Sequence, residues 1–133
     1  TKVSLLKKSM RILLISLVLS VMIIGVAVAA HANPSIQWHT ENVYYDSPGK
    51  LIIEGYFYNN GTRPIYWIDS HRVQVYFRTH DQEWWLQVET IFYDFNLTIR
   101  PGEASYWRLQ INDVDYQDFE YWLVHWETNF RYL

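Results

Sequence analysis

The sequence predicts an all-β fold: an immunoglobulin-like antiparallel β-sandwich of about seven strands, preceded by an N-terminal signal-peptide helix. Short extended segments recur after residue 32 with turn residues between them, and no long helical period appears there. A long apolar stretch preceded by basic residues occupies the N-terminus. About 100 residues after position 32 suit one sandwich domain and leave no room for a second core.

The N-terminal segment has the pattern of a secretory signal peptide. Residues 12–30 are apolar except for two serines and one glycine, and three lysines and an arginine precede them. Ala30-His31-Ala32 matches the small-x-small site of signal peptidase, so we expect residues 1–32 to be removed after Ala32. The alternative is an uncleaved membrane anchor, because this apolar stretch is just long enough to cross a bilayer. In both cases residues 33–133 form a single domain exported to the periplasm or the medium.

Composition excludes some partners and explains how the domain can be stable. The first 32 residues hold four of the 11 basic side chains and none of the 14 acidic ones, so the domain carries 7 basic and 14 acidic side chains, a net charge of -7. An acidic domain is a poor partner for nucleic acid or an anionic membrane. The chain has no cysteine, so packing of its 7 Trp, 11 Tyr and 6 Phe residues must replace the disulfides common in small exported domains.

Two strands and a reversal are expected at the start of the domain. Residues 36–45 read as a strand with a bulge near Thr40-Glu41, and turn residues follow it. Residues 50–58 form the next strand, and Asn59-Asn60-Gly61 ends it with a reversal for which we expect positive φ angles. Alternate residues of this second strand form its core face: Leu51, Ile53, Gly55 and Phe57.

The middle of the domain shows the same alternation. Asp69-Ser70 predicts a bend that divides residues 65–78 into two strands, the second with Val73, Val75 and Phe77 inward. Residues 85–95 form a further strand, with an expected inward set of Leu86, Val88, Thr90 and Phe92.

The last part of the domain contains two more strands and one irregular segment. Residues 104–112 and 120–131 alternate as strands. Residues 113–119 do not, and Asp115 with Asp118 three positions later could cap one short helical turn there.

Two spaced patterns suggest a family. The first is formed by Gly49, Leu51, Gly55, Asn59, Gly61 and Ile65, and the second by Ile99, Pro101, Gly102, Glu103, Trp107 and Leu109. These residues resemble the SLAP (S-layer-associated) domains of Firmicutes and the similar FxLYD-type secreted domains, over roughly residues 36–112. The resemblance implies a small immunoglobulin-like sandwich with a non-enzymatic role at the bacterial surface. The sequence departs from the pattern at residues 80–85 and in its aromatic C-terminal strand.

Polar residues offer weak candidates for catalysis or metal binding. The acidic group Asp113, Asp115, Asp118 and Glu120 could hold a cation, but it lacks the glycine of a calcium loop, and a solvated loop is the simpler interpretation. Asp69 and His71 could form a pair, yet no second pair has ligand spacing. We instead expect surface histidines and one packed histidine, His125. No nucleophile motif is present, so we expect no enzymatic activity, no metal and no cofactor.

The aromatic side chains are the strongest candidates for a binding surface. Six of them are expected on outer faces or beside a loop: Tyr56, Tyr58, Tyr76, Trp84, Trp85 and Tyr106. Such rings could bind a partner, or they could simply pack beneath Arg72, Arg78 and Arg108. We expect a non-catalytic binding or structural role in the bacterial cell envelope, with a protein or a glycan as partner. The alternative is a carbohydrate-binding module that uses exposed Trp and Tyr. The membrane would be contacted only through the signal segment if it is uncleaved.

Overall fold

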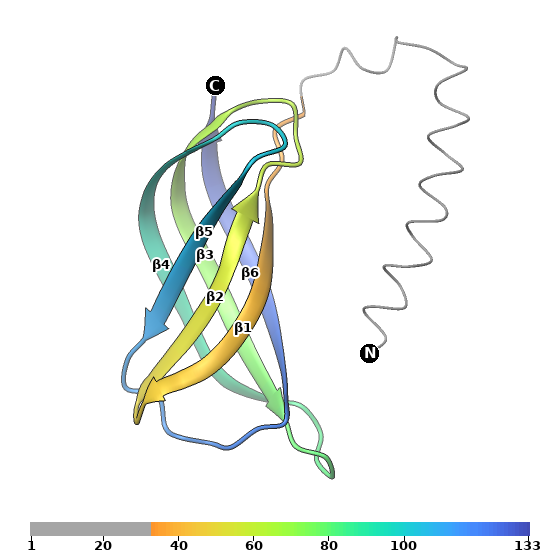
Figure 1. Ribbon diagram of the computed structural model, residues 1–133, viewed down its shortest axis with the longest axis vertical. Helices are drawn as coiled ribbons and strands as arrows, with labels where there is room; N and C mark the ends of the chain where they lie inside the picture. The colour runs from red at the N-terminus through yellow and green to blue at the C-terminus, as the bar shows by residue number, and fades with distance from the viewer. Residues whose placement is uncertain (1–32) are drawn as a thin grey trace, which may run out of the picture. The chain divides into compact units, whose positions relative to one another are not determined.

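The computed structural model describes residues 33–133, which form six strands in two antiparallel sheets (Figure 1). The predicted signal-peptide helix and the cleavage after Ala32 lie outside the described residues. In chain order the strands are β1 (Gln37–Ser47), β2 (Lys50–Tyr58), β3 (Ile65–Arg78), β4 (Trp85–Ile99), β5 (Ala104–Ile111) and β6 (Tyr121–Tyr132). Within this part of the chain no helix is long and apolar enough to cross a membrane.

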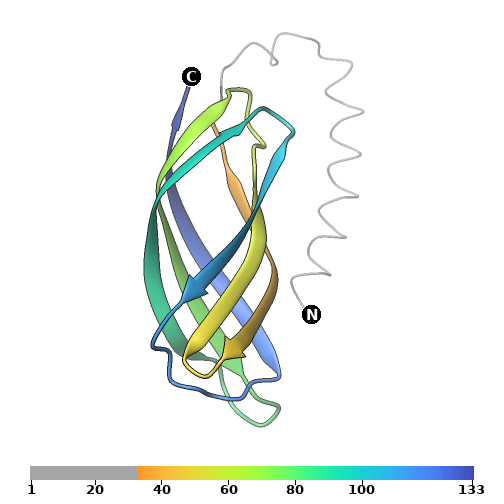
Figure 2. The same cartoon turned by 60° about the vertical axis from the view of Figure 1, so that its left-hand side comes forward.

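The two sheets pack face to face with the core between them. Sheet A has the order β1-β2-β5 and sheet B the order β4-β3-β6, and every neighbouring pair is antiparallel. Both views place β1, β2 and β5 in one layer in front of β3, β4 and β6 (Figures 1 and 2). The predicted all-β architecture is therefore confirmed at the level of two packed antiparallel sheets.

Alternation along β2 and β3 places their predicted core faces in the interior, and Ile52 on the other face of β2 is fully buried as well. The fully buried side chains include Leu51, Ile53 and Phe57 from β2 and Val73, Val75 and Phe77 from β3. Gly55 shares the β2 face and allows close approach of β1, since a Cβ there would lie 2.1 Å from the His39 carbonyl oxygen. The expected bulge in β1 is present between Thr40 and Asn42.

Six strands are seen in the described residues where about seven were expected. The difference lies at Asp69-Ser70, where a bend was predicted to divide residues 65–78. The chain instead stays in one 14-residue strand, β3, and the irregularity is absorbed as a shift of register against β6 between Ile68 and Ser70. Pairing to β4 continues on both sides of this point, so the strand does not break.

A buried side chain, rather than a left-handed glycine, holds the reversal after β2. Positive φ angles among the described glycines occur at Gly49 and Gly102, so the expectation of a positive φ at Gly61 was wrong. The Asn59 amide donates to the carbonyl oxygens of Arg63 and Ile99, each at 2.8 Å, and its Oδ1 accepts from the Gly61 N–H at 3.0 Å. Asn59 therefore ties the β2–β3 connection to the end of β4.

The segment between β5 and β6 closes one end of the sandwich without forming the predicted helical turn. Residues 112–120 are irregular in the structure, and Asp113 has a φ of 58°. Val114 is buried and donates its N–H to the Gly49 carbonyl oxygen at 3.0 Å. The Phe119 ring stacks on the Phe77 ring with centroids 3.9 Å apart. Packing of these two apolar side chains against the core favours a stretched path across the sandwich end over a capped turn.

Candidate functional site

The six predicted aromatic residues lie in three separate places. Tyr56, Tyr58 and Tyr106 lie on the outer face of sheet A, and Tyr76 lies on the outer face of sheet B. Trp85 is the first residue of β4, and Trp84 immediately precedes the strand. The structure therefore joins three of the six into one surface and leaves the others apart.

A row of rings crosses all three strands of sheet A. The register pairs His39 of β1 with Tyr56 of β2, and Tyr56 with Tyr106 of β5. The His39 and Tyr56 rings are stacked with centroids 5.0 Å apart and an interplanar angle of 17°. The Tyr56 and Tyr106 rings are also 5.0 Å apart, at 45°. Tyr106 is 70% exposed, so the row ends in a ring that solvent and partners can reach.

Tyr58 extends this aromatic surface along β2. It lies two residues beyond Tyr56 on the same face, where it pairs with Gln37 and Ala104. Tyr58 is half-buried. We call His39, Tyr56, Tyr58 and Tyr106 together the sheet A ring row.

An open depression of about 640 Å³ lies beside the ring row. It is lined by Glu41, Asn42, Glu54, Gly55, Tyr106, Trp107 and Arg108. Its acidic side chains outnumber its single basic one. The bulge in β1 falls between Thr40 and Asn42, so Glu41 is the extra residue that the sheet presents at this edge.

The charged groups near this depression are held by their neighbours. The Tyr44 hydroxyl donates a hydrogen bond to Glu54, and the Arg108 guanidinium lies 3.5 Å from the Asp46 carboxylate. A hydrogen bond with Tyr44 raises the pKa of Arg108, and the nearby carboxylates of Asp46 and Glu54 raise it further. Arg108 therefore keeps its positive charge across the physiological pH range.

The other outward rings are engaged with neighbouring side chains. Trp84 is 42% exposed, and its ring lies 5.2 Å from the Arg78 guanidinium, which also lies 4.8 Å from the Tyr121 ring. Packing of an arginine side chain over aromatic rings, one of the two possibilities that the sequence suggests, therefore occurs at Arg78. Tyr76 is half-buried with its ring 5.0 Å from that of His125. His125 is exposed, so the expectation that it is the packed histidine was wrong.

Trp85 faces the interior because β4 carries an irregularity. The register between β3 and β4 shifts between Val75 and Tyr76. Val75 pairs with Val88, whereas Tyr76 pairs with Leu86, so β4 has one extra residue at this point. One extra residue reverses the faces before the shift, so Leu86 is 47% exposed rather than inward as expected. The Trp85 ring meets Phe77 edge to face, with centroids 6.3 Å apart.

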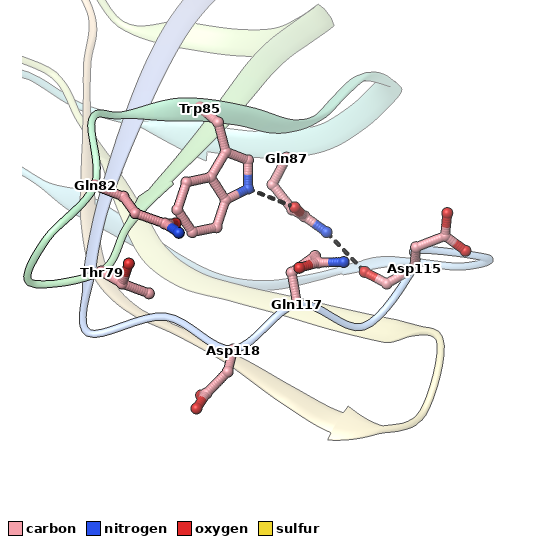
Figure 3. A pocket seen from close by; sticks show the side chains of 7 residues that line it. All are labelled: Thr79, Gln82, Trp85, Gln87, Asp115, Gln117 and Asp118. Atoms are coloured by element: carbon pink, nitrogen blue, oxygen red, sulfur yellow. Dashed lines mark hydrogen bonds between the residues drawn. The ribbon is translucent and has the colours of Figure 1, made fainter.

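A second depression of about 640 Å³, here called the end depression, lies at the sandwich end closed by residues 112–120 (Figure 3). It is lined by Thr79, Gln82, Trp85, Gln87, Asp115, Gln117 and Asp118. The Trp85 N–H donates to Gln87 Oε1 at 2.9 Å, and the Gln87 amide donates to the Asp115 carbonyl oxygen at 2.7 Å. These two bonds connect β4 to the loop that forms the opposite wall.

His71, considered as half of a catalytic pair, lies in the core instead. It is fully buried in β3, where its ring packs against Trp38, Phe57 and Phe95. Burial lowers the pKa of His71 to about 4. Asp69, the candidate partner of His71, accepts three hydrogen bonds from the Arg131 guanidinium, at 2.7, 3.0 and 3.3 Å. The two residues therefore do not act together.

The acidic loop does not assemble a cation site in the described residues. Across residues 33–133, no group of three or more His, Cys, Asp or Glu side chains is arranged to hold a metal ion. Asp118 accepts the N–H of Phe119, and Glu120 accepts that of His80 at 3.1 Å. These two carboxylates accept hydrogen bonds from local backbone.

Sequence reasoning missed two contributors to these surfaces. The sequence around His39 suggests an ordinary surface histidine, but pairing with β2 places its ring on Tyr56. The glutamines of the end depression, Gln82, Gln87 and Gln117, were not singled out because they come from separate segments. The sequence does carry one signal for this depression, since Gln82 and Gln87 lie on either side of the Trp84-Trp85 pair.

Comparison with known proteins gives little further information. No family model matches the chain, and no curated protein matches it. Among solved structures, the chain is similar to the Salmonella enterica trimeric lipoprotein SadB, with 10% sequence identity and a TM-score of 0.48. That match covers 98% of this chain and 82% of the other.

Proposed function

We propose that the protein is an exported, non-catalytic binding module of the bacterial cell envelope, and that it binds a protein partner on the outer face of sheet A. The observation that carries this proposal is the ring row from His39 through Tyr56 to Tyr106, beside a depression with acidic walls. Aromatic rings with a polar edge are enriched at protein interfaces, because they bury large area at low entropic cost.

The scaffold proposed for this module is immunoglobulin-like. The orders β1-β2-β5 and β4-β3-β6 correspond to strands A-B-E and C′-C-F of that fold. This correspondence, with the spaced glycines and asparagine of residues 49–65, supports the resemblance to SLAP and FxLYD-type domains. In this arrangement the ring row crosses all three strands of sheet A, and Tyr56 and Tyr58 lie on β2, the strand that is paired on both sides.

Charge indicates what kind of partner segment fits. Glu41 and Glu54 line the depression and Asp46 lies beside its one basic residue, while the domain as a whole carries a net charge of -7. A partner segment with basic side chains and at least one apolar anchor is complementary to this surface. A flat outer platform for glycans formed by Trp84 and Trp85 together has less support, because Trp84 is engaged by Arg78 and Trp85 lies on the inner side of sheet B, at the sandwich end.

Site-specific crosslinking tests the proposal. A photoreactive phenylalanine analogue placed at position 106 should crosslink one discrete envelope protein in intact cells. Position 93 is the matched control, since Tyr93 is 66% exposed but belongs to sheet B. Equal crosslinking from both positions, or none from position 106, would contradict the proposal.

Export is tested separately from binding. N-terminal sequencing of protein recovered from the periplasm or the medium should give Asn33 as the first residue, as expected for cleavage after Ala32. Recovery of the unprocessed chain with membranes would favour the uncleaved anchor. Recovery from the cytoplasm would contradict export altogether.

A further inference from the structure

The end depression has the size and position of a ligand site distinct from the ring row. Three segments meet there: the turn after β3 with Thr79 and Gln82, the start of β4, and the loop after β5. Its volume of about 640 Å³ falls inside the range of roughly 300–1,000 Å³ typical of small-molecule pockets. None of its lining residues belongs to the depression beside the ring row.

Its polar groups select for a ligand rich in hydroxyls. Three glutamine amides and a threonine hydroxyl line it, and each can both donate and accept hydrogen bonds. Two aspartate residues add acceptors, and no lysine, arginine or histidine lines the depression. A phosphate or carboxylate ligand would therefore meet acidic groups without a counter-charge.

Trp85 contributes an apolar surface rather than a hydrogen bond. Its N–H is already donated to Gln87, so the indole offers the depression only carbon and π surface. One ring among amides suits the C–H face of a sugar ring. An aromatic cage for a cationic ligand needs several rings, and Trp85 is the one aromatic residue lining this depression.

Hydrogen bonds hold the walls of the end depression in place, while two of its amide side chains remain available to a ligand. Among the residues drawn in Figure 3, the hydrogen bonds run from Trp85 to Gln87 and from Gln87 to Asp115, which leaves the amides of Gln82 and Gln117 open to a ligand. The loop backbone is fixed because the Gln117 N–H donates to the Tyr45 hydroxyl at 3.3 Å. Fixed walls reduce the ordering cost of binding.

We propose that the end depression binds a neutral oligosaccharide, with its sugar rings against Trp85 and its hydroxyls hydrogen-bonded to Gln82 and Gln117. This site is separate from the proposed protein-binding face. Each proposal can therefore fail without the other.

A titration followed by NMR of the tryptophan indole N–H signals tests this site in the whole exported protein. Cellotriose and N,N′,N″-triacetylchitotriose are the neutral probes, and trigalacturonate is the anionic probe. Nα-acetyl-lysine amide, with its free ε-ammonium group, is the cationic probe. A neutral trisaccharide should shift the Trp85 signal with a dissociation constant of about 1 mM or tighter. The anionic and cationic probes should leave it unchanged.

Variants distinguish the end depression from the rest of the surface. Replacing Gln82 and Gln117 together by alanine should weaken neutral trisaccharide binding by about fivefold or more, since two ligand hydrogen bonds are lost. Both side chains are exposed, so the fold should persist, as a circular dichroism spectrum can verify. Tyr106→Ala should bind the sugar as the unaltered protein does.

Three results would overturn the assignment. One is no Trp85 shift with either neutral probe up to about 10 mM, a range that covers weak sugar sites. Another is unchanged affinity in the double variant. The third is a stronger response to the anionic or the cationic probe than to the neutral ones.

Discussion

Protonation of His71 should destabilise the domain as the pH falls from 6.5 towards 4. The ring is fully buried, and its neighbours from four strands are Trp38, Phe57, Phe95 and Thr128, none of which can ionise in this range. Nδ1 lies 2.8 Å from the Thr128 hydroxyl, while Nε2 is buried with no partner among the described residues. In the charged ring, which carries a proton on both nitrogens, the Nε2–H would therefore have no acceptor among the described residues.

The size of the loss in unfolding free energy follows from the difference between the pKa of His71 in the folded chain and its pKa in the unfolded chain. Burial lowers the pKa from 6.5 to about 4, so the unfolded chain binds this proton more readily than the folded one. The stabilising effect of the neutral ring is fully present above pH 6.5 and is lost as the pH falls towards 4. At about 1.4 kcal/mol per pH unit, the loss approaches about 3 kcal/mol.

Urea denaturation followed by tryptophan fluorescence between pH 7 and pH 4 measures this loss. The reference is His71→Phe, which fits an aromatic surrounding and cannot titrate. Carboxylates that titrate near pH 4 affect both proteins equally, so the difference between their unfolding free energies isolates His71. His80→Gln removes an exposed histidine and should keep the full pH dependence of the unaltered protein.

Two results would refute this reasoning. The first is a His71→Phe variant whose unfolding free energy falls with pH as steeply as that of the unaltered protein. The second is an NMR titration in which the folded-state His71 ring takes up its proton near pH 6.5. In either case the buried ring would not control the acid sensitivity of the fold.

Three further substitutions test the scaffold. Asn59→Ala should lower the unfolding free energy by about 2–4 kcal/mol because it leaves buried carbonyl groups unpaired. The exposed neighbour Asn60→Ala should change it by less than about 0.5 kcal/mol in the same urea titration. Gly55→Ala should cost about 2 kcal/mol or more, since the new methyl group would overlap β1 backbone, and an unchanged melting temperature would contradict that. Phe119→Ala should cost about 2–3 kcal/mol and speed proteolysis within residues 112–120, because it removes the ring stacked on the core; proteolysis at the original rate would contradict its role in closing the end.

Local alternation predicted the core faces well because a regular strand leaves little choice. Leu51, Ile53 and Phe57 are buried as expected, since consecutive side chains of β2 point to opposite faces. The same rule failed in β4, where one irregularity reversed the faces of Trp85 and Leu86. A bulge depends on how two strands pair, and that pairing is not encoded within either strand alone.

Interactions between distant segments limited the prediction of the site. Alternation along each strand already separates the two histidines, because His71 shares the inward face of β3 with Val73 while His125 pairs with Gln74 on the outer face of sheet B. The ring row joins residues of β1, β2 and β5, so its existence follows from the strand order. The end depression likewise needs the loop after β5 to cross the sandwich end.

The affinity of the crosslinked partner for defined variants tests the central claim most directly. Purified partner should bind the domain carrying Tyr56→Ala and Tyr106→Ala at least about tenfold more weakly than the unaltered domain, because truncation of interface aromatic residues commonly costs more than 1 kcal/mol. Tyr93→Ala, which removes an equally exposed tyrosine from sheet B, should bind with unaltered affinity. Equal affinity of all three proteins would contradict binding through the outer face of sheet A.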